Sequence, residues 1–158
     1  MLKYHQRNTS ELVLITMEQP EYKASVMYAG DEFFISTTPS GHSQAIDTKG
    51  DRHSAASPLE LLLVSVAACT AADVISILQK KRQDVTDYRV EIEGDRREEY
   101  PRGFVAFRVH HIVYGRSVSE AAVASAIELS DTKYCSVAYT VRPTAEITTT
   151  HEILEHED

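Results

Sequence analysis

The sequence predicts an α+β fold in a single domain that covers residues 1–158. Three observations support this class. Segments rich in β-branched and aromatic residues are grouped at the start and in the second half of the chain, one long apolar segment carries the signals of a helix start, and a second, alanine-rich helix precedes the end. Strands and helices do not alternate strictly, as they would in a parallel α/β sheet. We therefore expect mainly antiparallel strands with a few helices.

Strands are predicted between about residues 11 and 37. Glu11–Glu18 is rich in Leu, Val and Ile, and Tyr22–Tyr28 and Phe33–Thr37 lie on either side of a turn at Ala29–Asp31. The following segment, Thr38–Ala56, is dense in Pro, Ser, Gly, Asp and His, which predicts a loop. Loops of that length, about 19 residues, are usually functional or mobile.

A central helix is predicted over residues 58–80. Ser57 can cap its N-terminus, Pro58 suits the first turn, and Glu60 stands three residues after the cap, as a capping box requires. The helix is apolar nearly all round from Leu61 to Leu78, and such a helix is expected to be buried on every side. A single sheet covers only one side of it, so we expect an obligate homodimer.

The second half of the chain predicts strands within 85–114, a second helix over 118–131 and a last strand over 141–148. Apolar and polar residues alternate in Tyr88–Glu93 and Phe104–Tyr114, as in half-buried strands. Ser117 with Glu120 three residues later resembles another capping box.

The composition excludes several function classes. The chain has 16 Lys and Arg against 24 Asp and Glu, a net charge of −8, which argues against binding to nucleic acid or to anionic membranes. We expect no membrane-spanning segment, and the first ten residues lack the apolar stretch of a secretory signal, so a cytoplasmic protein is predicted. The tail from His151 to His156 does not match the H-E-x-x-H zinc motif and is expected to be a frayed polar end. We expect no cofactor and no metal.

The central helix carries one polar stripe, and Cys69 lies in its middle. Ser65 lies one turn before Cys69 and Asp73 one turn after it. Cys69 could be a small core residue, as buried cysteines often are, or a reactive thiol. Asp73 would raise the pKa of a neighbouring thiol, so a reactive Cys69 requires a cation that reaches the stripe from elsewhere.

The two cysteine segments resemble those of the OsmC/Ohr-like family. The run Ser57–Leu63, continuing to Cys69, resembles the central helix of that family, and Lys133–Val137 resembles its second cysteine motif, with the second cysteine 66 positions after the first. The similarity covers roughly Tyr22 to Glu152. It implies antiparallel sheets wrapped around a long buried central helix in an intertwined homodimer, with the active sites where the subunits meet.

The resemblance also implies a thiol peroxidase that reduces organic hydroperoxides or other peroxides in oxidative stress defence. Cys69 would be the peroxidatic thiol and Cys135 the resolving thiol, so both are expected to come within disulfide reach. A small dithiol or a lipoylated protein would then reduce the disulfide.

The sequence departs from the hydroperoxide-resistance members of this family at two points. Those members carry a Glu ten residues before the first cysteine, where this chain has Leu59, while Glu60 already has a capping role. They also use an Arg from an early strand, for which Arg52 and Arg142 are among the remaining candidates. These departures indicate a divergent branch. The alternative is a non-catalytic dimeric protein that holds an apolar ligand near Cys69 or senses redox state.

Overall fold

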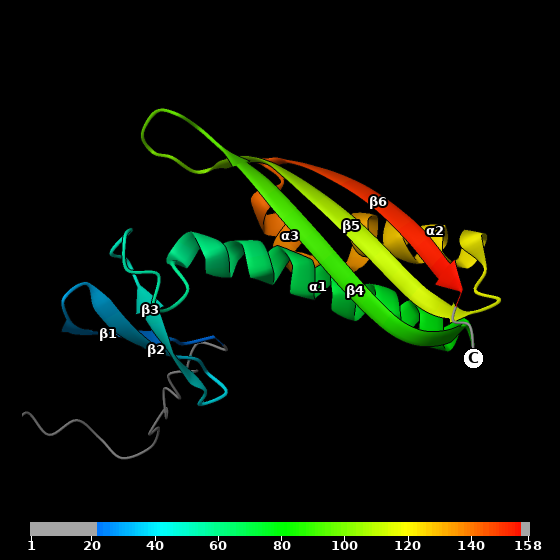
Figure 1. Ribbon diagram of the computed structural model, residues 1–158, viewed down its shortest axis with the longest axis horizontal. Helices are drawn as coiled ribbons and strands as arrows, with labels where there is room; N and C mark the ends of the chain where they lie inside the picture. Colours follow the sequence, from blue (N-terminus) through cyan, green and yellow to red (C-terminus); the bar gives the residue numbers. More distant parts are fainter. Residues whose placement is uncertain (1–21, 156–158) are drawn as a thin grey trace, which may run out of the picture.

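The structure is a computed structural model, and it describes residues 22–155. It contains two three-stranded sheets and a layer of helices, which confirms the mixed α+β class (Figure 1). The predicted strand Glu11–Glu18 lies outside the described residues.

The N-terminal sheet is an antiparallel meander of β1 (Ser25–Gly30), β2 (Phe33–Thr37) and β3 (Ser43–Asp47). The prediction of a loop throughout Thr38–Ala56 is therefore wrong, because β3 lies within it. Its polar composition hides a strand that pairs with β2 along its whole length. A tight turn makes this possible, since Gly41 adopts a φ of 83° and the Thr38 amide donates to the His42 carbonyl at 2.9 Å.

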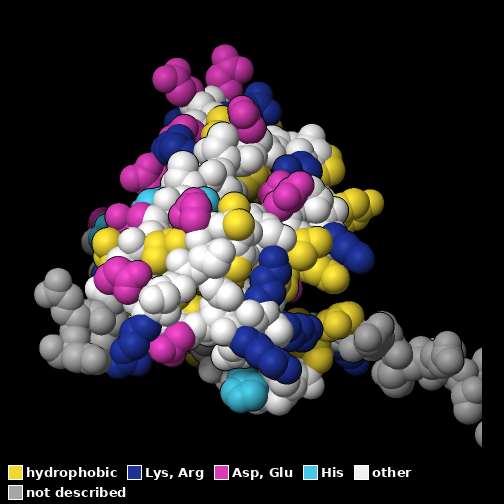
Figure 2. All heavy atoms as spheres, turned by 90° about the vertical axis from the view of Figure 1, so that its right-hand side faces the viewer, with side chains coloured by type: hydrophobic (Ala, Val, Ile, Leu, Met, Phe, Trp, Pro, Cys, Tyr) yellow, Lys and Arg dark blue, Asp and Glu magenta, His cyan; other side chains and the backbone are white. Residues whose placement is uncertain are grey.

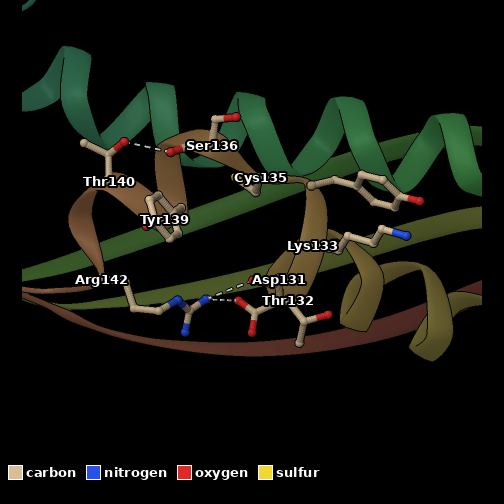
Figure 3. A pocket seen from close by; sticks show the side chains of 9 residues that line it. Asp131, Thr132, Lys133, Cys135, Ser136, Tyr139, Thr140 and Arg142 are labelled. Carbon is tan, nitrogen blue, oxygen red and sulfur yellow. Dashed lines mark hydrogen bonds and ion pairs between the residues drawn. The ribbon is translucent and has the colours of Figure 1, made fainter.

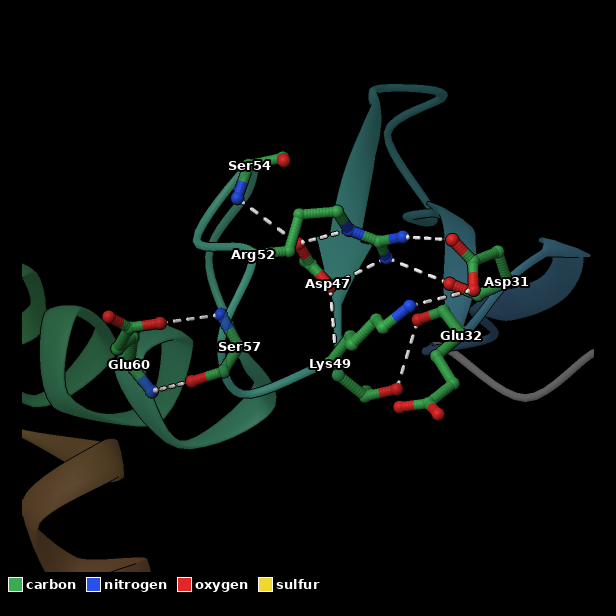
Figure 4. A network of polar contacts seen from close by, with 9 residues as sticks. Asp31, Glu32, Asp47, Lys49, Arg52, Ser54, Ser57 and Glu60 are labelled. Atoms are coloured by element: carbon green, nitrogen blue, oxygen red, sulfur yellow. Dashed lines mark hydrogen bonds and ion pairs between the residues drawn. The ribbon is translucent and has the colours of Figure 1, made fainter.

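The rest of that segment is closed by a clamp around Arg52 (Figure 4). The guanidinium donates to both carboxylate oxygens of Asp47, at 2.9 and 2.8 Å, and to Asp31 at 2.7 Å. It also lies over the ring of Phe33, 3.7 Å from the centroid. The Asp47 side chain is only 1% exposed. The hydrogen bonds from Arg52 hold the pKa of Asp47 well below its usual range.

Asp47→Asn is expected to loosen this clamp, so that a protease cleaves the 48–56 segment severalfold faster in limited proteolysis. The depressed pKa fixes the sign of the pH effect. The ion pair stabilises the loop fully above the ordinary carboxyl pKa of about 4, and its contribution is lost as pH falls below that value. The difference between wild type and variant should therefore shrink under peptic digestion at low pH. Equal cleavage rates at neutral pH would contradict a clamp role for Asp47.

The central helix α1 spans Pro58–Lys80, and its predicted capping box is confirmed. Glu60 accepts the Ser57 amide at 2.7 Å, and the Ser57 hydroxyl accepts the Glu60 amide at 3.3 Å. The expectation of burial on every side is wrong for the single chain. Packing covers one face, with Val66, Val74 and Leu78 buried, but a stripe on the opposite side is open. We call this the open stripe; it contains Val64, which is 60% exposed, together with Ser65, Ala68 and Ala72.

Helix α1 also contradicts the prediction that no segment is long and apolar enough to span a membrane. It is long and apolar enough to cross a membrane by length and composition, with a mean hydropathy of 2.3. Core helices of soluble proteins meet the same criterion, because both must place apolar side chains out of water.

The second sheet has the order β4–β5–β6, with β4 at Asp84–Arg96, β5 at Phe104–Arg116 and β6 at Glu146–Glu155. The β4–β5 pair is antiparallel as predicted, but β5 and β6 are parallel. A parallel neighbour requires a crossover connection, and the chain makes one through three helical pieces. These are α2 (Glu120–Leu129), the π-helical turn η1 (Ser130–Tyr134) and α3 (Ser136–Val141).

The crossover overturns three details of the prediction. The second helix is capped by Ser119 and not by Ser117, which instead has a φ of 50°. The last strand begins at Glu146, because Val141 ends α3 and is buried against the core. The tail is not frayed at His151, which lies within β6 and pairs with His111 of β5.

The helices pack on one face of the β4–β5–β6 sheet, and the core lies between these two layers (Figure 1). The inward residues of β5 include Phe107, Val109 and Val113, all buried. His111 shares this face and is completely buried, with its Nδ1 atom 2.5 Å from the Tyr88 hydroxyl. Burial lowers the pKa of His111 to about 4, so it is neutral in the core.

The surface at the end of the molecule where α1 finishes carries charges of both signs. Figure 2 shows Lys and Arg side chains gathered mostly in the lower part of this face and Asp and Glu mostly above them, with apolar side chains along one edge. Lys80, Lys81 and Arg82 are exposed at the C-terminus of α1, where cations complement the helix dipole. Their solvent-exposed position at a helix C-terminus accounts for these three cations, and no ligand is needed to explain them.

Candidate functional site

The two cysteines and Asp73 lie together between α1 and the crossover. The sulfur atoms of Cys69 and Cys135 and a carboxylate oxygen of Asp73 are all within 4.8 Å of one another, and both thiols are free. The helical repeat of α1 places Asp73 one turn after Cys69. Packing of the crossover against α1 brings in Cys135 from 66 residues further along the chain.

The π-helical turn η1 fixes the position of Cys135. Its amide donates to the Ser130 carbonyl at 2.9 Å, which closes the turn and stops the helical path. Cys135 then caps α3, where its sulfur accepts the Ala138 amide at 3.4 Å. π-turns often occur at functional sites, because the extra residue redirects a side chain. Here the turn directs the thiol of Cys135 toward α1.

The two thiols differ in environment. Cys135 is 4% exposed, whereas Cys69 is partly exposed. Burial raises the pKa of the Cys135 thiol to about 11, and the neighbouring Cys69 and Asp73 add to the rise, while the Ala138 amide opposes it. Cys135 is therefore a protonated thiol at neutral pH. The more accessible Cys69 is the better placed of the two to meet a molecule from solvent.

Two hydroxyl groups that the sequence reasoning missed orient Asp73. Ser130 is completely buried and donates to Asp73 Oδ2 at 3.0 Å, and the Thr70 hydroxyl lies 3.1 Å from that of Ser130. Thr70 could have been found, because it stands three residues before Asp73 and thus on the same helical face. Ser130 could not, since its position depends on how α2 packs against α1.

The other residues singled out from the sequence lie elsewhere. The Ser65 hydroxyl is exposed and donates to its own helix, to Leu61 O at 2.7 Å. Glu60 serves the cap, Arg52 is engaged in the clamp, and Arg142 forms an ion pair with Asp131. Among residues 22–155, the ion pairs include none between Asp73 and a cation. A reactive Cys69 requires a cation near this stripe, and the described part of one chain places none in an ion pair with Asp73.

A hollow of about 610 Å³ opens beside Cys135 on the crossover (Figure 3). We call it the crossover hollow. Tyr139, 80% exposed, stands in it, and the Lys133 ammonium lies 5.3 Å from the ring centroid of Tyr134. Figure 3 shows Arg142 and Asp131 joined on the side of the hollow opposite to α1. A space of this size with aromatic and charged walls can hold a small organic molecule.

A second hollow, of about 620 Å³, is predominantly apolar and lies near the start of α1. Leu59, Leu62, Phe104 and Phe107 contribute to its walls. Leu62 lies seven residues before Cys69 and therefore on the same helical stripe. This space suits an apolar ligand better than a charged one.

Comparisons with known proteins agree with this architecture. A family model described as OsmC-like protein matches residues 49–150. Protein YhfA of Escherichia coli K12 is 43% identical over 133 residues, which cover 84% of this chain and 98% of YhfA. The crystal structure of a hypothetical protein from Aquifex aeolicus VF5 has a TM-score of 0.78 at 32% identity, over 86% of this chain and 98% of that chain. An organic hydroperoxide resistance protein from Legionella pneumophila has a TM-score of 0.63 at 14% identity, over 83% and 96% of the two chains, a likeness of fold alone.

Proposed function

The chain belongs to the OsmC-like protein family, and on that premise we propose that it is a cysteine-based thiol peroxidase that reduces organic hydroperoxides in the cytoplasm. One observation carries the proposal. Two free thiols of unequal exposure, Cys69 and Cys135, have their sulfur atoms within 4.8 Å of each other although they lie 66 positions apart in the sequence. A partly exposed thiol beside a buried protonated thiol is the arrangement that a two-cysteine peroxidase needs.

The proposed reaction has three balanced steps. The Cys69 thiolate attacks the outer oxygen of a hydroperoxide, the O–O bond breaks, and the products are a Cys69 sulfenic acid and an alkoxide that is protonated to the alcohol. The Cys135 sulfur then attacks the Cys69 sulfur, which forms the disulfide and releases water. A small dithiol or a lipoylated protein reduces this disulfide to two thiols and is itself oxidised to a disulfide.

The proposed active form is a homodimer. The open stripe of α1 leaves Val64 and its neighbours in solvent, and the exposed apolar residues of the N-terminal sheet, Val26, Met27 and Tyr28, likewise lack cover. Burial of these two surfaces in a second copy would remove apolar area from water, which stabilises the dimer. Because the stripe adjoins the cysteine face of α1, the partner subunit is also our proposed source of the cation that activates Cys69.

Peptide mapping tests the pairing of the cysteines. Treatment with a slight excess of cumene hydroperoxide, followed by digestion without reductant, should yield one peptide pair that links Cys69 to Cys135. The bond should form within one chain, so the product should run as a monomer on a denaturing non-reducing gel. Two free thiols after this treatment, in protein that remains folded by circular dichroism, would contradict the proposal.

Turnover is tested by peroxide-dependent consumption of dithiothreitol, compared between cumene hydroperoxide and hydrogen peroxide. Faster consumption with the organic peroxide is expected, because the apolar hollow and the tyrosines of the crossover hollow favour an organic group. Oxidation of the thiols without catalytic consumption of dithiothreitol would favour a redox sensor over a peroxidase.

The second candidate function is a non-catalytic dimeric protein that holds an apolar ligand. The apolar hollow at Leu59 and Leu62 favours it, because Leu62 in its wall lies on the same helical stripe as Cys69. Organic extraction of the purified protein followed by mass spectrometry should reveal a stoichiometric apolar molecule under this alternative, and none under the peroxidase proposal.

A further inference from the structure

We propose that the reduced pair Cys69 and Cys135, together with Asp73, binds a thiophilic divalent cation of the Zn²⁺ type. The sequence alone predicts no metal site, since it contains no recognised ligand spacing. The three ligands come together only through the packing of the crossover on α1. This site goes beyond peroxide reduction, because it requires neither a peroxide nor turnover.

The geometry of the cluster fits such a cation. One atom from each of the three side chains lies within 4.8 Å of the others. Zinc binds thiolate sulfur at about 2.3 Å and carboxylate oxygen at about 2.0–2.2 Å, so tetrahedral ligand atoms stand roughly 3.5–3.8 Å apart. Small side-chain rotations therefore suffice to close the cluster around an ion. Three protein ligands leave a fourth position for water or for an exogenous thiol.

The surrounding hydrogen bonds orient the ligands as in established metal sites. The completely buried Ser130 donates to one oxygen of Asp73 at 3.0 Å and leaves the other oxygen available. The Thr70 hydroxyl, 3.1 Å away, fixes Ser130 in turn. Ligating carboxylates are commonly held by such outer hydrogen bonds, and loss of one outer partner typically weakens metal binding by about 10–100-fold.

The charge of the cluster also favours a cation. The ion pairs among the described residues provide the Asp73 carboxylate with no positive charge. A divalent cation would supply that charge, and soft sulfur ligands favour Zn²⁺ and Cd²⁺ over Mg²⁺ and Ca²⁺. Binding displaces up to two thiol protons into solvent, one from each cysteine. Affinity should therefore rise with pH.

Metal binding and disulfide formation exclude each other, because both use the same sulfur electron pairs. A bound ion would shield Cys69 from peroxide, and the disulfide would release the ion. This consequence, unlike the site itself, rests on the proposed peroxidase function. The cation would then inhibit oxidation of Cys69 and Cys135 by peroxide when thiophilic metal is plentiful.

Titration of the reduced full chain with Cd²⁺, without peroxide and under argon, tests the site. We expect a sulfur-to-cadmium charge-transfer band in the ultraviolet that saturates at one ion per chain, and proton release when the same titration is followed calorimetrically in two buffers. Cys69→Ser and Cys135→Ser should each lose tight binding. Asp73→Asn and Ser130→Ala should weaken it by about tenfold or more, while Glu128→Gln, an exposed carboxylate on α2, should leave it unchanged.

Two results would overturn the proposal. One is the absence of a saturable charge-transfer band in the reduced wild type, and the other is a band of equal affinity in Asp73→Asn and Ser130→Ala. If one substitution impairs folding, the other still decides the matter. Peroxide-driven disulfide formation is then measured with and without saturating Zn²⁺. A failure of turnover with intact metal binding would refute the peroxidase and leave the metal site standing.

Discussion

Cys69→Ser is expected to abolish peroxide-dependent consumption of dithiothreitol, whereas Cys135→Ser should reduce one equivalent of peroxide and stop at a sulfenic acid. The two thiols differ in accessibility and in protonation. Cys69 is partly exposed, while the pKa of the buried Cys135 is raised to about 11. Only a thiolate attacks the O–O bond, and without Cys135 the sulfenic acid has no internal thiol with which to condense.

Stopped-flow peroxide consumption and trapping of the sulfenic acid with dimedone measure the two outcomes. Circular dichroism and light scattering of both variants provide the control for folding and assembly. Wild-type peroxide reduction by Cys69→Ser would show that the assigned roles are wrong. Continued multiple turnover by Cys135→Ser would show that an external thiol, and not Cys135, resolves the sulfenic acid.

Val64→Asp is expected to convert the proposed dimer into a monomer or into unfolded chains. Val64 stands on the open stripe with 60% of its surface exposed, so the described residues of a single chain leave this apolar side chain largely in water. A carboxylate at this position would have to lose its water in the dimer interface, which costs several kcal/mol or prevents assembly.

Light scattering at micromolar concentration measures this effect, with Leu154→Asp as the matched control. Leu154 is also an exposed apolar residue, but it lies on β6, away from the open stripe. We expect the control to remain dimeric. A wild-type protein that is monomeric at this concentration and still folded would contradict the dimer, and so would a Val64→Asp variant that remains a folded dimer.

The central helix was predictable because its signals are local. A capping box involves residues three positions apart, and an apolar face repeats every three to four residues, so both can be found without knowing what the helix packs against. The stripe of Ser65, Cys69 and Asp73 follows from the same repeat. The residues that α1 contributes to the proposed site were therefore predictable, including Asp73 as a neighbour of Cys69.

The remainder depends on contacts distant in sequence. The strand β3 is too polar to show a strand pattern and forms because β2 offers an edge. The parallel pairing of β6 with β5 follows from the crossover connection, and no local sequence pattern predicts that connection. Ser130 donates a hydrogen bond to Asp73 only when η1 lies against α1. The open stripe could not be predicted, because the exposure of a helix face depends on which other elements pack against it.

The placement of Cys135 in the crossover couples the stability of the fold to the reduction potential of the cysteine pair. A Cys69–Cys135 disulfide would close a loop of 66 residues, and in the chain-entropy model such a loop stabilises the folded state by about 4 kcal/mol. By thermodynamic linkage, folding must favour the disulfide by the same amount. That corresponds to a potential roughly 90 mV more reducing than in the unfolded chain. The packing of three short helical segments on α1 would thus set how strong a reductant the proposed disulfide requires.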